Sequence, residues 1–160
     1  KPPVGVMIEV PAAIYSIRLM AKSVDFFSLG TNDLTQYLLA VDRGNKRVSK
    51  LYDHFHPAVL HCIRDAIEGA RAAGKPVSVC GEMAADPFGA VLLLGMGVSS
   101  LSMAAPGIPH IKWVIRSFTF EQARELLDRA LELADSGAIR SLLTPALENA
   151  GLGGLIRAGR

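Results

Sequence analysis

The chain has 160 residues, with 17 lysines and arginines against 15 aspartates and glutamates, and a net charge of +2 at neutral pH. Half of the residues are hydrophobic and a fifth are charged, which excludes a disordered chain and is typical of one globular domain. The basic residues form no cluster that would indicate a nucleic-acid or membrane surface, and the apolar runs are far shorter than the ~20 residues of a membrane-spanning helix.

Four short apolar runs have the character of strands, at residues 4–10, 24–29, 76–80 and 98–103. Most are nearly continuous in apolar residues, which is typical of parallel strands buried on both faces. Helical patterns follow the four runs in turn, at residues 12–22, 57–73, 87–94 and 109–116. This alternation predicts a parallel sheet with right-handed crossovers.

The remaining segments lie at the two ends of the chain. We expect a longer helix over residues 120–135, a helical pair over residues 139–149, and a loose or docked tail over residues 151–160, which hold four glycines. The first three residues run directly into a strand pattern without a signal-peptide pattern, so we expect a fragment of a longer protein.

One connection differs from the others, because a long polar insertion over residues 31–56 separates the second strand from the next long helix. Polar insertions at the end of a buried strand are where functional residues usually lie. The other polar groups also follow strands: Glu9 ends the first, Cys80-Gly81-Glu82 ends the third, and Ser102 lies on the fourth. In a parallel α/β protein these strand ends share one face, and that face holds the site.

Two carboxylates at neighbouring strand ends indicate a metal site. Glu9 interrupts an apolar run, and a buried carboxylate is costly unless it is ion-paired or binds a metal. Thr31, Asn32 or Asp33 could instead cap the helix that follows. Together, Glu9 and Asp33 offer a sparse oxygen site of the kind that Mg²⁺ favours, since this ion keeps several waters and takes substrate oxygens.

The other candidate residues are an arginine, two cysteines and a glutamate. Arg43 lies in the polar insertion, and its guanidinium suits a phosphate or carboxylate, although arginine is also an ordinary surface residue. Cys80 lies at a strand end, where a thiol acts as a nucleophile or proton donor or simply packs in the core. Cys62 lies in an amphipathic helix, where a packing role is favoured. Glu82 either orients a ligand or forms a salt bridge.

Several other site types receive little support. The two cysteines form no Cys-x-x-Cys pair, which gives no support to zinc or a redox pair, leaves a disulfide open and favours a reducing cytoplasm. His54 and His56 have a spacing that could bind a metal, but such pairs more often end a loop and cap the next helix. No glycine-rich nucleotide-binding motif is present.

The motifs GVMIEVPAA, VDFFSLGTNDLTQYLLAVDRGN, HPAVL, GKPVSVCGEMAADP and LLLGMGVSSLSMA follow one another over residues 4–105. In order and spacing they resemble the phosphoenolpyruvate-utilising enzymes, and within that family the phosphoenolpyruvate–protein phosphotransferases, or Enzyme I of the bacterial phosphotransferase system. The tail GLGGLIRAG is more similar to the nitrogen-regulatory branch than to the sugar branch.

This resemblance implies a TIM (β/α)₈ barrel, of which residues 1–117 are the carboxyl-terminal half, with the last four βα units, and residues 118–160 are a helical extension with a glycine-rich tail. Glu9 and Asp33 match the magnesium ligands of the family, and Asn32, Asp33 and Arg43 match residues that bind phosphoenolpyruvate. Cys80 matches the general acid that protonates the enolate carbon of pyruvate. Neither histidine of the His54-x-His56 pair matches the phosphorylated histidine, which the resemblance places in an amino-terminal domain.

The implied reaction moves the phosphoryl group of phosphoenolpyruvate to an enzyme histidine and on to a histidine phosphocarrier protein, and releases pyruvate. Two alternatives stay open, namely a pyruvate phosphate dikinase or phosphoenolpyruvate synthase barrel, and a non-catalytic dimerisation module. A half barrel has two unpaired edge strands. We therefore expect the fragment alone to be inactive and to form a homodimer, to cover an edge with its tail, or to be marginally stable.

Overall fold

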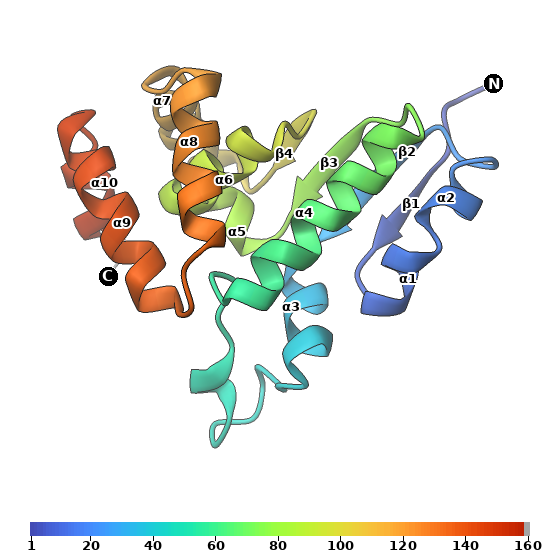
Figure 1. Ribbon diagram of the computed structural model, residues 1–160, viewed down its shortest axis with the longest axis horizontal. Coiled ribbons are helices and arrows are strands. Elements are labelled where there is room, and N and C mark those ends of the chain that lie inside the picture. The colour runs from blue at the N-terminus through green and yellow to red at the C-terminus, as the bar shows by residue number, and fades with distance from the viewer. Residues whose placement is uncertain (159–160) are drawn as a thin grey trace.

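A four-stranded parallel sheet organises residues 1–158, which are the residues that the computed structural model describes (Figure 1). The strands lie side by side in chain order: β1 (Gly5–Ile8), β2 (Phe26–Gly30), β3 (Val77–Cys80) and β4 (Ser100–Ser102). Neighbouring strands pair in parallel register, with Ile8 opposite Leu29, Leu29 opposite Val79, and Val79 opposite Leu101. The predicted parallel α/β sheet and its four strands are confirmed.

Ten helices connect or follow these strands within the described residues. They are α1 (Pro11–Tyr15), α2 (Ile17–Met20), α3 (Thr31–Leu39), α4 (Pro57–Ala72), α5 (Glu82–Ala85), α6 (Pro87–Met96), α7 (Ile108–Arg116), α8 (Phe120–Leu131), α9 (Ser136–Asn149) and α10 (Gly153–Ala158). Two short 3₁₀ helices, η1 (Ser49–Leu51) and η2 (Ala105–Gly107), lie in the loops. None of the helices in residues 1–158 is both long and apolar enough to cross a membrane.

The two faces of the sheet differ in what they carry. Phe27, Leu29, Val77 and Val79 are buried on the face that the helices cover, where they form the core with residues such as Leu60 of α4. The opposite face presents one row of residues in register across the strands: Met7, Ser28, Ser78 and Ser100. Met7 is 48% exposed. The expectation that the strands are buried on both faces is therefore met on one face only, because closing the other face requires further strands.

An aromatic ring lies against the beginning of the first strand. Gly5 is paired with Phe26, and a Cβ atom at position 5 would overlap the Phe26 ring. Only glycine leaves room for this ring to lie against the neighbouring strand.

Local sequence signals explain where the long helices begin. The Asp86 carboxylate accepts hydrogen bonds from the backbone N–H groups of Phe88 and Gly89, as expected for an N-cap before α6. His56 Nδ1 accepts from the backbone N–H of Ala58 at 3.2 Å, so this histidine caps α4, as the favoured interpretation of the His54-x-His56 pair predicts.

Three helix predictions are wrong in detail, and one short helix was missed. The helix expected over residues 120–135 ends earlier, at Leu131. The helix expected over residues 12–22 is broken at Ser16, whose N–H bonds to the Ala13 carbonyl in a tighter turn between α1 and α2. The pair expected over residues 139–149 is the single helix α9, which continues through Pro145. The short helix α5 was not predicted, because it spans only four residues and is too short to show a periodic pattern.

The tail is docked over the residues that can be described. Leu152 and Ile156 are buried in the core, and α10 packs against α9. Residues 159–160 of the predicted tail lie outside the described residues.

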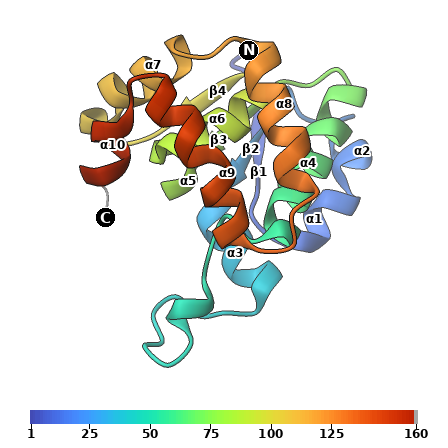
Figure 2. The same ribbon diagram turned by 60° about the vertical axis from the view of Figure 1, so that its left-hand side comes forward.

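The carboxyl ends of the strands, α3 and the start of α5 gather at one end of the molecule. From α3 the chain runs into a loop over residues 40–56 that extends away from the body before α4 begins (Figures 1 and 2). This loop is the polar insertion minus its helical part, so the predicted insertion does lie beside the strand ends.

Candidate functional site

Glu9 lies against the end of the neighbouring strand. A Cβ atom at Gly30 would stand 3.2 Å from Glu9 Oε2 and 3.2 Å from Met7 Sδ, so a side chain at position 30 would crowd the carboxylate. No lysine or arginine of residues 1–158 forms a salt bridge with Glu9. The ion-pair alternative for Glu9 is therefore not the one that the structure takes.

The first residues of α3 turn their side chains to other segments instead of capping their own helix. The residue before α3 is Gly30, and no side chain caps this end. Thr31 Oγ1 donates to the backbone carbonyl of Cys80 at 2.9 Å, and Asp33 Oδ1 lies 3.6 Å from Arg43 Nη2. The capping alternative is thus wrong. The side chains at the start of α3 instead contact β3 and the loop.

Asn32 is held in one orientation by the next βα turn. Its Oδ1 accepts a hydrogen bond from the backbone N–H of Glu82 at 2.9 Å. Because that partner is a donor, the amide must present its oxygen there, which leaves both N–H groups of Asn32 for an acceptor such as a phosphate or carboxylate. The Glu82 side chain is exposed and forms no salt bridge within the described part of the chain, so the salt-bridge role considered for it is not the one the structure takes.

Gly81 makes this approach possible. Its φ of +114° lies in the region that glycine adopts readily, and a Cβ atom there would clash with Thr31 Oγ1 and stand 2.9 Å from Asn32 Oδ1. The turn after β3 can therefore lie directly on the start of α3.

Arg43 reaches the site from the loop. Its guanidinium is 44% exposed and the Asp33 carboxylate 41%, so this contact at 3.6 Å is worth under ~1 kcal/mol. Such a weak pair exchanges easily for a stronger anionic ligand. The backbone N–H of Arg43 donates to Gln36 Oε1 at 3.2 Å, which ties the beginning of the loop to α3.

Tyr52 ties the end of the same loop to the site. Its hydroxyl donates to the backbone carbonyl of Asn32 at 3.1 Å. Burial raises the pKa of Tyr52, and the nearby Glu82 carboxylate raises it further. The phenol therefore keeps its proton and remains a donor to Asn32 at neutral pH.

The two cysteines have different surroundings, as their positions predicted. Cys80 Sγ lies 3.4 Å from the Leu29 carbonyl and 3.9 Å from Ser28 Oγ, on the open side of the sheet. Cys62 is half-buried in α4, and burial, with the Asp65 carboxylate, raises its pKa to about 11. Both thiols are free, so the disulfide that the sequence left open is not formed.

The donor set fits a magnesium ion but not an ion that needs a full protein cage. Glu9 and Asp33 follow adjacent strands, and no group of three or more histidine, cysteine or acidic residues that could hold a metal occurs within residues 1–158. A pair of carboxylates of this kind suits Mg²⁺, which completes its octahedron with water and substrate oxygens. His54 lies 3.9 Å from Asp86 rather than beside either carboxylate.

Two residues of the site were not predicted. Thr31 was considered only as a cap and Tyr52 only as part of the polar insertion. The one available signal for Tyr52 was that it is the single tyrosine of loop 40–56, since a tyrosine usually docks where its hydroxyl finds a partner.

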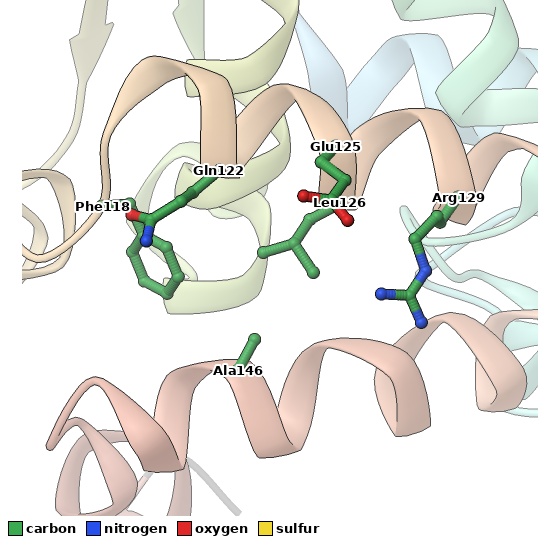
Figure 3. A pocket seen from close by; sticks show the side chains of 6 residues that line it. All are labelled: Phe118, Gln122, Glu125, Leu126, Arg129 and Ala146. Atoms are coloured by element: carbon green, nitrogen blue, oxygen red, sulfur yellow. The ribbon is translucent and has the colours of Figure 1, made fainter.

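The hollows on the helical side do not coincide with these residues. One of about 240 Å³ lies between α8 and α9, where Figure 3 shows Gln122, Leu126 and Arg129 from α8 facing Ala146 from α9. Another of about 430 Å³ is lined by α1, α3 and α4, and includes Cys62. Neither contains a strand-end residue, so the candidate site stays with the strand ends.

Comparisons with known proteins identify the family of the chain. The family profile described as PEP-utilising enzyme, PEP-binding domain, where PEP is phosphoenolpyruvate, matches residues 1–120. A protein of Salmonella typhimurium named phosphoenolpyruvate-dependent phosphotransferase system is 42% identical over 99% of this chain and 21% of its own length. The phosphoenolpyruvate-protein phosphotransferase of Haemophilus influenzae is 49% identical over 88% of this chain and 24% of its own length.

A third relative, the phosphoenolpyruvate-protein phosphotransferase of Staphylococcus carnosus, is 42% identical over 91% of this chain and 26% of its own length. The chain thus spans about a fifth to a quarter of the relatives it matches. Because the profile covers 120 of the 160 residues, including every strand of the sheet, the chain belongs to the family of phosphoenolpyruvate-utilising enzymes and contains part of its phosphoenolpyruvate-binding domain.

Proposed function

We propose that this chain is the carboxyl-terminal, phosphoenolpyruvate-binding part of a phosphoenolpyruvate–protein phosphotransferase. The observation that carries the proposal is the meeting of Asn32, Asp33 and Arg43 with Glu9 and Cys80 at adjacent strand ends. Each of these residues matches the motif of the family in which it has a role. The high identity to phosphotransferases over most of the chain favours this branch over the dikinase and synthase alternatives.

Substrate binding follows from the charges and donors of the site. Arg43 supplies a planar cationic fork, and Asn32 supplies two N–H donors, which together suit the phosphate and carboxylate of phosphoenolpyruvate. Glu9 and Asp33 would hold the magnesium ion, which supplies positive charge that offsets the charge of the substrate. The release of Asp33 from its weak contact with Arg43 would free both groups for these roles.

The reaction then divides into two bond changes. The bond between phosphorus and the enol oxygen breaks as a histidine nitrogen takes the phosphoryl group; this histidine is not in the motifs matched by this chain. A small histidine phosphocarrier then accepts the phosphoryl group from that histidine. The enolpyruvate that remains needs a proton at carbon. The Cys80 thiol, whose Sγ lies 3.4 Å from the Leu29 carbonyl, delivers that proton and regains one from water.

The surrounding assignments belong to the same proposal. Residues 1–117 form the last four βα units of a (β/α)₈ barrel, and residues 118–160 form a helical extension of the same domain. In this proposal the intact protein acts in the cytoplasm as a homodimer, and the likeness of its tail to the nitrogen-regulatory branch supports an assignment to that branch. The parallel order of the strands and the open sheet face of this chain support the barrel.

Labelled phosphoenolpyruvate tests the proposed function in the intact protein. We expect label to pass to a small histidine phosphocarrier, with one pyruvate formed for each phosphoryl group. Transfer to AMP or to inorganic phosphate instead would favour the dikinase or synthase alternative. Phosphoenolpyruvate left unconsumed with every acceptor would favour the non-catalytic module.

A further inference from the structure

A contact between α9 and the loop over residues 40–56 joins two parts of the chain that are far apart in sequence. Arg140 Nη2 donates to Asp53 Oδ1 at 2.8 Å, across 87 residues. Arg140 lies in the second turn of α9, and Asp53 lies near the end of the loop. Neither residue belongs to the site described above.

The Arg140 guanidinium makes a second contact with the same segment. Its Cζ stands 4.2 Å from the centroid of the Phe55 ring, which is fully buried. Phe55 in turn packs edge to face on Phe88 of α6, with ring centroids 6.3 Å apart. Asp53 Oδ1 also accepts from the backbone N–H of Phe55 at 2.9 Å. The loop end is thus held by an ion pair, a cation–π contact and a buried ring.

This anchored segment leads directly to the site. Tyr52, the residue before Asp53, donates to the Asn32 carbonyl at 3.1 Å. The other end of the loop is tied to α3 where the backbone N–H of Arg43 meets Gln36 Oε1. Between these two ties the loop extends from the body, so its position depends on its ends (Figure 2).

We propose that Arg140 is a positioning residue, which fixes the end of loop 40–56 so that Tyr52 holds Asn32 and the loop presents Arg43 to phosphoenolpyruvate. Arg140 touches neither substrate nor metal ligands, and it acts through Asp53 and Tyr52. The substrate part of this inference rests on the proposed function, whereas the part that concerns the loop does not.

Kinetics of the intact protein test the substrate part. In Arg140→Gln we expect the KM for phosphoenolpyruvate to rise about three- to tenfold and kcat to change less than about twofold. The rise in KM corresponds to the loss of roughly 1 kcal/mol, because the substitution removes a partly exposed ion pair and a ring contact. Arg140→Lys keeps the positive charge but loses the planar fork of N–H donors, so its KM should lie between those of the unsubstituted protein and Arg140→Gln. The matched control is Arg157→Gln, because Arg157 pairs with Glu148 on the same helical extension, at 3.4 Å and away from the loop.

Hydrogen exchange of the same proteins tests the loop part without substrate. We expect faster exchange of the amides of residues 42–52 in Arg140→Gln, with α4 and α6 unchanged. If Arg140→Gln is poorly folded, Asp53→Asn removes the charge from the other side of the pair while keeping the oxygen that accepts from Phe55.

The outcomes separate the inference from the proposed function. The positioning role would be overturned if the loop amides of Arg140→Gln exchanged hydrogen at the same rate as those of Arg157→Gln. It would also be overturned if the exchange rate in Arg140→Gln rose equally over the whole protein. A fall in kcat with KM unchanged would overturn it too. A protein that does not consume phosphoenolpyruvate at all would overturn the proposed function, and the exchange result would then decide the loop part alone.

Discussion

The amide oxygen of Asn32 accepts a hydrogen bond from the backbone N–H of Glu82 at 2.9 Å, although the two residues are 50 positions apart. This bond joins the βα turns that follow β2 and β3. It fixes which end of the amide faces the site, and it is possible only because Gly81 between β3 and α5 has no side chain.

Gly81→Ala should therefore damage both stability and substrate binding. The new Cβ would meet Thr31 Oγ1 and Asn32 Oδ1, and φ is +114°, so we expect a loss of about 1–3 kcal/mol and a raised KM for phosphoenolpyruvate. Gly74→Ala is the control, since φ there is +68° but nothing lies within 4 Å, and it should cost about 1 kcal/mol with KM unchanged. Urea unfolding and steady-state kinetics measure both. Equal KM values would contradict the role of Gly81.

Asp33→Asn should lower activity in the intact protein about 100-fold with the fold intact, because it removes one of two carboxylates available to magnesium. Raising the magnesium concentration should recover part of the loss. Asp128→Asn, which changes an exposed aspartate on α8, serves as the control. Turnover like that of the unsubstituted protein at limiting magnesium would show that Asp33 is not a ligand.

Cys80→Ala should block pyruvate formation by about 10²-fold or more while leaving phosphoryl exchange less affected, because only the protonation of carbon needs the thiol. Cys62→Ala is the matched substitution and should cost only packing energy. Rapid-quench measurement of phosphoenzyme and pyruvate separates the two steps. Equal kinetic damage from both substitutions would mean that Cys80 has no special role.

The stability of the protein should fall as the pH rises from about 9 to about 11. Burial and the Asp65 carboxylate raise the pKa of Cys62 from 9.0 to about 11, so in this window the unfolded thiol has lost its proton while the folded one keeps it. The contribution of Cys62 to the free energy of unfolding is fully present below pH 9 and is lost as the pH rises through the pKa of the thiol in the folded protein. Urea unfolding at pH 8 and pH 10.5 measures it. Cys62→Ala should show a shallower decline, and identical declines would disprove the assignment.

The chain of 160 residues by itself should not phosphorylate a carrier and should not persist as a stable monomer. β1 and β4 are edge strands, and unpaired backbone groups along them destabilise a half barrel. Through residue 158 the tail packs on α9 as α10 and not on an edge strand, which favours a dimer or marginal stability over an edge covered by the tail. Sedimentation and a phosphotransfer assay test this. A stable, active monomer would refute it.

The strand ends were predictable because the signals for them are local. Glu9 and Cys80 end short apolar runs, and parallel strands bring such ends together whatever the details of packing. It was not predictable that Thr31 and Asn32 form hydrogen bonds with the end of β3 and the start of α5 instead of capping α3. These bonds depend on how closely the turn after β2 approaches the turn after β3.

The contact between Arg140 and Asp53 that anchors the loop could not be predicted from the sequence either. Arg140 and Asp53 are ordinary surface residue types, and nothing within a few residues of either indicates the partner. The packing of α9 against α6 and α8 brings them together. Tertiary contacts of this kind decide the details of the site, whereas periodicity decides only where it lies.

The Phe26 ring covers the open face of the sheet at the start of β1, where it lies against Gly5. Farther along the strands the same face carries the short side chains of Ser28, Ser78 and Cys80. Free space on this face is therefore left beside the strand ends rather than beside the Phe26 ring. A side chain at position 5 would disturb the start of β1 and β2 and leave the strand ends as they are.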